Sequence, residues 1–201
     1  MQVQSLPRAS RDAAARMLAR SFEDDPMFRF LLSNGRTRPA WLELVMVTAL
    51  DECLAHGEVL VADLDGLAGA IGIIPPALHS APAFTRISSL VWLFLSTLPP
   101  PPPLAFLLNG PRVLNLIGAK HPRDPHLYVQ VLGADPERQG RGVGAALVER
   151  ALERAARDGV YAYLETTNAK NLVFYGRFGF RVIEGISPSP GGGPPIWLLR
   201  T

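Results

Sequence analysis

Gln139-Gly140-Arg141-Gly142-Val143-Gly144 is a glycine-rich turn between a strand expected over Leu127–Ala134 and a helix expected over Val143–Arg157. Three glycines let the backbone approach a ligand closely and adopt φ values that other residues avoid. The first N–H groups of a helix have no partner within it, and the helix dipole favours negative charge there. The turn therefore predicts an anion site, to which Arg138 and Arg141 add positive charge, and a pyrophosphate is the simplest ligand.

Two other phosphate-binding motifs fit this loop less well. A Walker A loop requires Gly-Lys-Ser/Thr after its glycines, whereas two alanines follow Gly144. A dinucleotide fingerprint matches as Gly140-x-Gly142-x-x-Ala145, with Glu165 about 20 residues further on. In that fold the strand runs almost directly into the first glycine, but here five residues intervene. A glycine-rich turn that binds nothing is a third alternative.

The segments on both sides of the loop extend the pattern in a particular order. Gln139-x-x-Gly142-x-Gly144 has the form Q/R-x-x-G-x-G/A. It follows the strand-like stretch His126–Pro136 and precedes Tyr163–Phe180, which is typical of a strand, a short helix and a Gly-Phe turn. Over about 55 residues, the chain resembles the GNAT acyltransferases, whose loop of this form binds the pyrophosphate of coenzyme A. The resemblance implies an α/β GNAT fold, with a mixed, mostly antiparallel central sheet flanked by helices, and acetyl-CoA as co-substrate.

Within that family, the chain most resembles the puromycin N-acetyltransferase branch. The likeness rests on the total length and on four segments: Pro136-x-x-Gln139-Gly140, Leu164-Glu165-Thr166, Asn171-Leu172-x-Phe174-Tyr175 and the ending 193–197. It is looser before residue 120, in the part of the chain expected to form the acceptor site. The likeness therefore does not establish puromycin as the substrate.

The composition indicates how many domains, which partners and which location to expect for the chain. A chain of 201 residues suits a single GNAT domain over residues 1–201. With 20 basic and 18 acidic residues and no basic run, nucleic acid is not an expected partner. The single cysteine, Cys53, cannot form an internal disulfide, and the scattered histidines show no metal-ligand spacing, so no metal is expected. The longest apolar run, Leu90–Leu95, is too short to span a bilayer, and we expect a cytoplasmic protein.

The other elements are predicted from apolar periodicity and turn signals. Three helices are expected in the first third of the chain: Arg11–Phe22 capped by Ser10, Met27–Leu32, and Pro39–His56. Asp63-Leu-Asp-Gly66 predicts the turn of a hairpin. The expected strands of this hairpin and of the C-terminal part are Glu58–Ala62, Leu67–Ile74, Tyr161–Glu165, Arg181–Glu184 and Ile196–Arg200.

Residues 77–125 are expected to form an apolar helical insertion. Ala83–Leu98 and Leu104–Ala119 are apolar and flank the run Pro99–Pro103, and the second stretch is expected to break at Gly110-Pro111. One interpretation is that the insertion lines the acceptor pocket and shapes the choice of acceptor. The other is that it is core and a dimer surface, which leaves a homodimer open.

Acyl transfer from a thioester to an amine needs a bound thioester, a neutral amine, donors for the oxyanion and a proton for the departing thiolate. The resemblance implies that the strand around Val131 and Leu132 splays from Tyr161–Glu165 and that its free backbone groups bind the pantetheine. An amide near Leu132 would then face the thioester carbonyl. It also implies that one run of backbone amides binds the pyrophosphate: Gln139, Gly140, Arg141, Gly142, Val143, Gly144 and Ala145.

The resemblance assigns Tyr175 as the general acid and Asn171 and Phe174 as coenzyme contacts. A phenol with an ordinary pKa of about 10 can protonate a thiolate whose thiol has a pKa of about 8.5. The alternatives are a tyrosine that only packs on the short helix and, for Asn171, an amide on the helix surface.

The general base is open from the sequence. An alkyl amine with a pKa of about 10.4 is mostly protonated at neutral pH. Glu165 ends a strand beside the predicted gap and could accept the proton directly or through water, or it could hold backbone amides instead. Glu23, Asp24 and Asp25 could attract a cationic amine, or they could only form the turn and cap the next helix. His121 and His126 are two further candidates for the base.

We therefore expect an acetyl-CoA-dependent N-acetyltransferase that acts on a primary amine of a small molecule. The amine attacks the thioester directly, without a covalent enzyme intermediate. One alternative is a non-catalytic acyl-CoA-binding sensor or regulatory module, and consumption of the thioester separates the two. A second alternative is an enzyme that acetylates peptide or protein amines.

Overall fold

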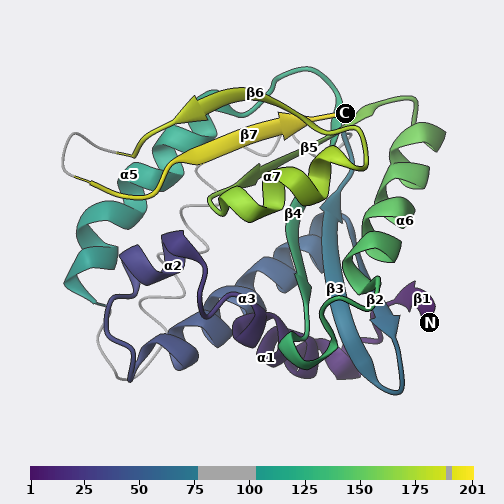
Figure 1. Cartoon of the computed structure of the whole chain (residues 1–201), viewed down its shortest axis with the longest axis horizontal. Coiled ribbons are helices and arrows are strands. Elements are labelled where there is room, and N and C mark those ends of the chain that lie inside the picture. The colour runs from purple at the N-terminus through teal and green to yellow at the C-terminus, as the bar shows by residue number, and fades with distance from the viewer. Residues whose placement is uncertain (77–102, 189–191) are drawn as a thin grey trace.

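The computed structural model describes residues 1–76, 103–188 and 192–201 and contains a seven-stranded sheet in the order β1-β2-β3-β4-β5-β7-β6 (Figure 1). The strands are β1 Gln2–Ser5, β2 Glu58–Asp63, β3 Leu67–Ile74, β4 His126–Ala134, β5 Tyr161–Thr166, β6 Arg181–Ile186 and β7 Ile196–Arg200. Neighbouring strands are antiparallel except β4 and β5, which are parallel. The predicted α/β fold with a mixed, mostly antiparallel sheet is confirmed.

Helices cover both faces of the sheet (Figure 1). They are α1 Arg11–Ser21, α2 Pro26–Leu31, α3 Arg38–His56, α5 Leu104–Lys120, α6 Val143–Arg157 and α7 Ala169–Gly176, with short 3₁₀ turns at Arg8–Ser10 and Pro136–Arg138. One apolar cluster joins α1, α2, α3 and α5 to residues such as Val131 and Tyr163. A second joins α6 and α7 to the alternate residues, such as Leu127 and Leu164, because successive side chains of a strand point to opposite faces.

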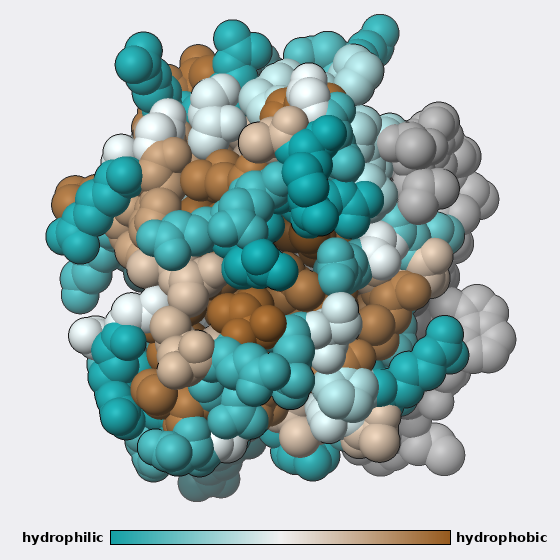
Figure 2. All heavy atoms as spheres, turned by 90° about the vertical axis from the view of Figure 1, so that its right-hand side faces the viewer, coloured by the Kyte–Doolittle hydropathy of each residue, from teal (hydrophilic) through white to brown (hydrophobic). Residues whose placement is uncertain are grey.

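Helix α6 shows why the fold follows from local sequence. Its apolar side chains recur at helical spacing and are buried on the sheet: Val143, Leu147, Val148, Ala151 and Ala155. Its outer face carries charges, among them Arg150 and Glu153, whose side chains approach to 2.6 Å. Figure 2 looks onto the side of the molecule that carries α6, where hydrophilic residues surround an apolar area near the centre of the view.

The two parallel strands diverge after three residue pairs. The ladder joins His126–Tyr128 of β4 to Tyr161–Tyr163 of β5 and then ends, although both strands continue. On its other side, β4 remains paired with β3, with a bulge between Val129 and Val131. From Val129 on, β4 therefore has no ladder partner on its β5 side, as the predicted splay requires.

Several local expectations need correction. Ser10 precedes α1 but makes no capping hydrogen bond with its side chain, because the turn Arg8–Ser10 leads directly into the helix. Helix α5 continues through Pro111 instead of breaking, and the carbonyl that loses its partner belongs to Leu107, an exposed residue that water can reach. Strand β1 was not expected, because its four residues form an exposed edge strand with little apolar signal.

Other boundaries shift by one or two residues. Helix α2 begins at Pro26 because the Asp25 side chain accepts from the amides of Met27 and Phe28, so the capping role of Asp25 is confirmed.

The apolar stretch before Leu104 and most of the proline run lie outside the described residues. Among the residues that the structure describes, no helix has the length and apolar character needed to cross a membrane.

Candidate active site

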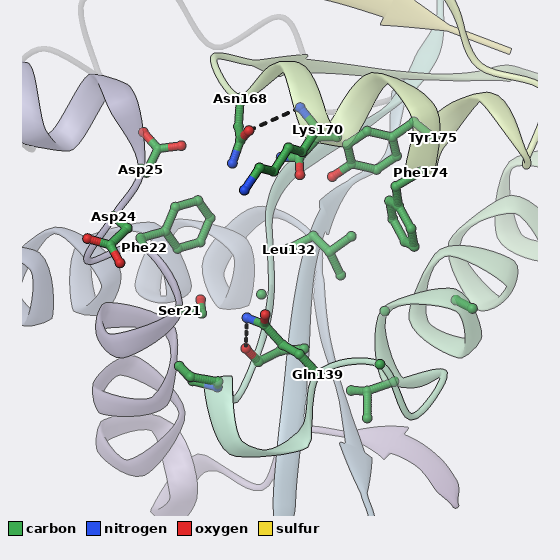
Figure 3. Close-up of a pocket in the computed structure, with 18 of the residues that line it drawn as sticks. Ser21, Phe22, Asp24, Asp25, Leu132, Gln139, Asn168, Lys170, Phe174 and Tyr175 are labelled. Carbon is green, nitrogen blue, oxygen red and sulfur yellow. Dashed lines mark hydrogen bonds between the residues drawn. The ribbon is translucent and has the colours of Figure 1, made fainter.

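A cleft of about 760 Å³ opens where β4 and β5 diverge, between the start of α6, helix α7 and the connection from α1 to α2 (Figure 3). It brings together ten of the residues predicted to bind the coenzyme or to act as the acid: Leu132, Gln139, Gly140, Gly142, Val143, Gly144, Ala145, Asn171, Phe174 and Tyr175. These come from three separate segments of the chain. The cleft is therefore a tertiary feature in which the glycine-rich loop and the predicted acid share one space.

Three other predicted site residues do not line this cleft. Val131 is buried in the apolar core on the α1 and α3 side of the sheet. Arg141 is exposed on the loop. The Glu165 side chain is only 9% exposed and lies with its Oε1 atom 3.5 Å from Nδ1 of His121. A contact of Val131 with a ligand in the cleft would thus have to come from its backbone.

The loop has the backbone geometry of an anion site. Gly140 and Gly142 have φ of +74° and +81°, which L side chains rarely adopt, and no described atom would touch a Cβ at either position. Gly142 is the N-cap of α6, so the amides that follow begin the helix at the edge of the cleft. The Gln139 side chain closes the turn by donating to the carbonyl of Ala134 at 3.4 Å (Figure 3).

Helix α7 supplies the opposite wall of the cleft. A Cβ on Gly144 would lie 3.2 Å from Cζ of Phe174, so the glycine leaves room for this ring beside the start of α6. Asn171 lines the cleft, and its Nδ2 donates to Oγ1 of Thr166 at 3.0 Å. This bond ties α7 to the end of β5, which fixes the direction in which the helix presents its side chains.

Tyr175 combines burial with an open hydroxyl. The residue is 7% exposed, and its ring packs edge-on against Phe174 and Phe180 at centroid distances of 5.1 and 5.5 Å. Its hydroxyl points into the cleft in Figure 3. Burial raises the pKa of Tyr175 well above its ordinary value, because a phenolate would lose its hydration. The phenol therefore stays protonated at neutral pH, and the same burial makes it a weaker acid than a phenol in water.

The cations that face the cleft are not those expected on the loop. Arg138 turns away and donates to the carbonyls of Asp65 and Gly66 at 2.8 and 3.4 Å, in the turn between β2 and β3. The cleft is lined instead by Arg20 of α1, Lys170 of α7 and Arg177 just after α7. Sequence reasoning missed all three, because nothing local distinguishes them from other surface cations.

Asp135 holds Arg20 at the cleft. The Asp135 side chain is 9% exposed; one oxygen accepts from the Glu137 amide at 3.0 Å and the other from the Arg20 guanidinium. Burial by itself would raise the pKa of Asp135, but the Glu137 amide and Arg20 outweigh it and lower the pKa below its ordinary value. The ion pair joins α1 to the start of the glycine-rich loop.

Asp135→Asn is expected to lower the free energy of unfolding by about 1–3 kcal/mol at pH 7 and to weaken coenzyme binding, because one oxygen cannot serve both donors. A lowered pKa stabilises the fold above the unfolded-state pKa of about 3.9, and that contribution is lost as pH falls through the folded-state pKa. The difference in the free energy of unfolding between the variant and the parent protein should therefore shrink in acid. Urea unfolding of both proteins at pH 7 and below pH 4 measures this difference.

The matched control is Asp51→Asn, which removes an exposed partner of Arg11 at 3.1 Å. This variant should stay within about 0.5 kcal/mol of the parent protein. Equal stability of Asp135→Asn and the parent at pH 7 would contradict the role given to the Asp135 ion pair.

The side of the cleft toward α2 is acidic and aromatic. Asp24, Asp25 and Phe22 line it, and Figure 3 shows them across the cleft from Tyr175. Asp25 is held by the amides that it caps and by the Thr167 hydroxyl, which lies 3.2 Å from both carboxylate oxygens. Burial raises the pKa of Asp25, although these hydrogen bonds partly offset the effect. In the described part of the chain, no group of three or more His, Cys, Asp or Glu is arranged to hold a metal ion.

The parallel strands of a mixed sheet diverge beside a glycine-rich helix start, and a buried tyrosine faces the same cleft, which is the arrangement that the resemblance to the GNAT acyltransferases implies. The model of the Acetyltransferase (GNAT) family matches residues 37–180. The match covers more than half of the chain, so the chain belongs to this family.

Individual relatives agree with this assignment. The acetyltransferase Atu2258 of Agrobacterium fabrum (strain C58 / ATCC 33970) is 36% identical over 75 residues, which covers 37% of this chain and 55% of the relative. The chain thus spans about half the length of this curated relative. A solved structure from Corynebacterium glutamicum ATCC 13032, described as histone acetyltransferase HPA2 and related acetyltransferase, has a TM-score of 0.70 at 23% identity, covering 99% of this chain and 94% of that one.

A further solved structure, yncA from Salmonella typhimurium with its cofactor acetyl-CoA, has a TM-score of 0.56 at 15% identity. It covers 100% of this chain and 92% of that chain. At these identities the two solved structures establish the shared fold.

Proposed function

We propose that the protein transfers the acetyl group of acetyl-CoA to a primary amine of a small molecule, and that the amine attacks the thioester directly. The observation that carries the proposal is the shared cleft. The glycine-rich loop, the Tyr175 hydroxyl and an acidic wall line one space of about 760 Å³. An anion, a leaving group and a cationic acceptor could therefore be held together.

The loop would bind the pyrophosphate of coenzyme A. The first amides of α6 and the positive end of its dipole favour a phosphate there. Arg20, Lys170 and Arg177 line the same cleft and add positive charge. The backbone of β4 around Leu132, which has no ladder partner on its β5 side, would bind the pantetheine.

The chemical step needs two proton transfers. The amine nitrogen forms a bond to the thioester carbon, and the C–S bond breaks when the tetrahedral intermediate collapses. Tyr175 gives its phenolic proton to the departing thiolate, and Glu165 accepts the proton that the amine loses. Because Glu165 does not line the cleft, its transfer runs through an intervening water.

No covalent enzyme intermediate is required. The single cysteine, Cys53, is fully buried, and its Sγ donates to Oε1 of Gln130 at 3.1 Å, on the side of α3. This thiol is packed in the core and is not among the residues that line the cleft. This supports direct attack by the acceptor.

The acidic wall supports a cationic amine as the acceptor. Asp24 and Asp25 would attract an ammonium group, and Phe22 would contact an apolar or aromatic part of the same molecule. The likeness to the puromycin N-acetyltransferase branch remains a prediction about which amine this is. A dimer and a single domain over the whole chain also remain predictions.

Release of free thiol from acetyl-CoA tests the proposal. The amines are puromycin, an aminoglycoside, a polyamine, an arylalkylamine and short peptides, each compared with a reaction that lacks the amine. We expect release with at least one small amine and little with peptides. Preferential release with peptides would replace the small molecule by a protein acceptor, and no release from folded protein with any amine would contradict the proposed reaction.

A further inference from the structure

A cluster of histidines and tyrosines lies outside the cleft, where the chain leaves α5 and enters β4. His121 follows the helix directly and His126 begins the strand. Their Nε2 atoms lie 3.1 Å apart. Both rings pack edge-on against Tyr163, which is fully buried, at centroid distances of 5.1 and 5.3 Å. The two histidines therefore occupy fixed positions in a packed environment.

The Glu165 carboxylate is the third polar member of the cluster. Its side chain is 9% exposed, and Oε1 lies 3.5 Å from Nδ1 of His121. Within the described residues, no donor lies within hydrogen-bond length of this oxygen, and the buried Tyr163 hydroxyl, which interacts with the same carboxylate, also lacks a close partner. A buried carboxylate oxygen without a donor is costly, so a proton placed between Glu165 and His121 would be stabilised there.

The contacts of His126 indicate which nitrogen of His121 carries the proton. Nδ1 of His126 lies 2.8 Å from the peptide carbonyl of Asp124, which can only accept, so Nδ1 carries a proton and donates. Nε2 of neutral His126 is then an acceptor, and the proton between the two rings belongs to Nε2 of His121. In neutral His121, Nδ1 therefore has a lone pair, and this lone pair faces Glu165.

The 3.5 Å distance fits this arrangement, because two lone pairs facing one another cannot approach to hydrogen-bond length. One added proton would turn the contact into a charge-assisted hydrogen bond. Burial lowers the pKa of His126, although the Asp124 carbonyl partly offsets the effect, and this keeps His126 neutral in the tautomer that orients His121.

We propose that Glu165 and His121 act as one proton-sharing pair that receives the proton of the acceptor amine, with His126 as the residue that positions His121. The inference rests on the proposed transfer reaction. One proton leaves the ammonium group and is shared by Oε1 of Glu165 and Nδ1 of His121, and it returns to solvent between turnovers. No other bond forms or breaks in this step.

Several ionisable groups lie around the pair. Among the described residues they come from the segment before β4 and from the neighbouring strands and helix: Asp124, Tyr128, Tyr161, Tyr163, Glu184, Arg200 and Lys120. Lys120 is bound to Glu184 at 2.5 Å, and Asp124 accepts from the Tyr161 hydroxyl at 2.7 Å. Desolvation, assisted by Asp124, raises the pKa of Tyr161 to about 12, so its hydroxyl stays neutral.

His121→Asn tests the pair through the pH dependence of acetyl transfer to an alkyl amine. We expect kcat/KM for the amine to fall by roughly 10–100-fold at pH 7. The deficit should shrink as the pH approaches the pKa of the amine, about 10.4, because the acceptor is then deprotonated in solution. The affinity for coenzyme A should not change. The matched control is His56→Asn, at the exposed end of α3, with an unchanged profile.

The double variant with Glu165→Gln separates a shared function from two independent ones. If the two side chains act as a unit, the double variant should be about as slow as the slower single variant. A pH-independent loss in His121→Asn, or additive losses in the double variant, would overturn the proposal.

Imidazole ¹⁵N NMR of the unmodified protein tests the tautomers without any substitution. We expect His126 as the Nδ1–H form and His121 as the Nε2–H form at alkaline pH. The opposite tautomer of His121 would overturn the proposal whatever the activity is. If the unmodified protein consumes no thioester, the transfer reaction itself is contradicted, and the tautomers still decide whether the pair is formed.

Discussion

Tyr175→Phe is expected to lower kcat for acetyl transfer by about 10²–10⁴-fold while coenzyme A binds with nearly unchanged affinity. The substitution removes only the hydroxyl, which points into the cleft (Figure 3). The ring keeps its contacts with Phe174 and Phe180. Without the phenol, the departing thiolate must take its proton from water, and this raises the barrier to collapse of the tetrahedral intermediate.

The measurements are steady-state kinetics with a responsive amine and titration with coenzyme A. Burial is the cause of the raised pKa of Tyr175, so ionisation of this group should not reduce activity below about pH 10, its ordinary pKa. Phe174→Leu serves as the contrast: this ring lines the cleft beside Gly144, and its loss should raise KM for acetyl-CoA more than it lowers kcat. A fully active Tyr175→Phe variant would refute the acid role.

Gly142→Val is expected to raise the dissociation constant for coenzyme A by about 10–100-fold. Gly142 has a φ of +81°, and a β-branched residue is strained by at least about 1–2 kcal/mol in that region. The strain is relieved if the loop changes shape. Because Gly142 is the N-cap of α6, such a change would turn the first amides of the helix away from the phosphate.

The same helix offers a matched control. Gly159, just beyond the other end of α6, has a φ of +67°, and no described atom would touch a Cβ there. Gly159→Val should lower thermal stability by an amount similar to Gly142→Val and leave the coenzyme affinity unchanged, since Gly159 does not line the cleft. Equal affinities for the two variants would show that the loop geometry is not needed to bind coenzyme.

Elements with strong local signals were predictable. The bounds of α6, Val143–Arg157, and of β3, Leu67–Ile74, agree with the sequence-based prediction. Both have apolar residues at the expected spacing and a turn signal at one end. The predictions failed where the outcome depended on the environment, as at Pro111, where an exposed neighbouring carbonyl lets α5 continue.

The candidate site was predictable in part. The sequence singled out the loop and the residues Asn171, Phe174 and Tyr175, and all of them except Arg141 line the cleft. Their chemical roles stay predictions. The acidic wall was foreseen at Asp24 and Asp25, but the cations were assigned to the wrong side chains. Side-chain direction on a surface depends on partners that no local pattern reveals.

The sequence by itself determined the glycine-rich turn, the helix that follows it and the position of Tyr175 on a short helix, because φ restrictions, apolar spacing and capping act over a few residues. Only the tertiary structure decided which groups meet. Arg20 reaches Asp135 although the two are 115 residues apart, and His121 faces Glu165 from the end of another element. These contacts follow from the packing of α1 and α5 on a sheet whose central strands diverge, and packing is a property of the whole fold.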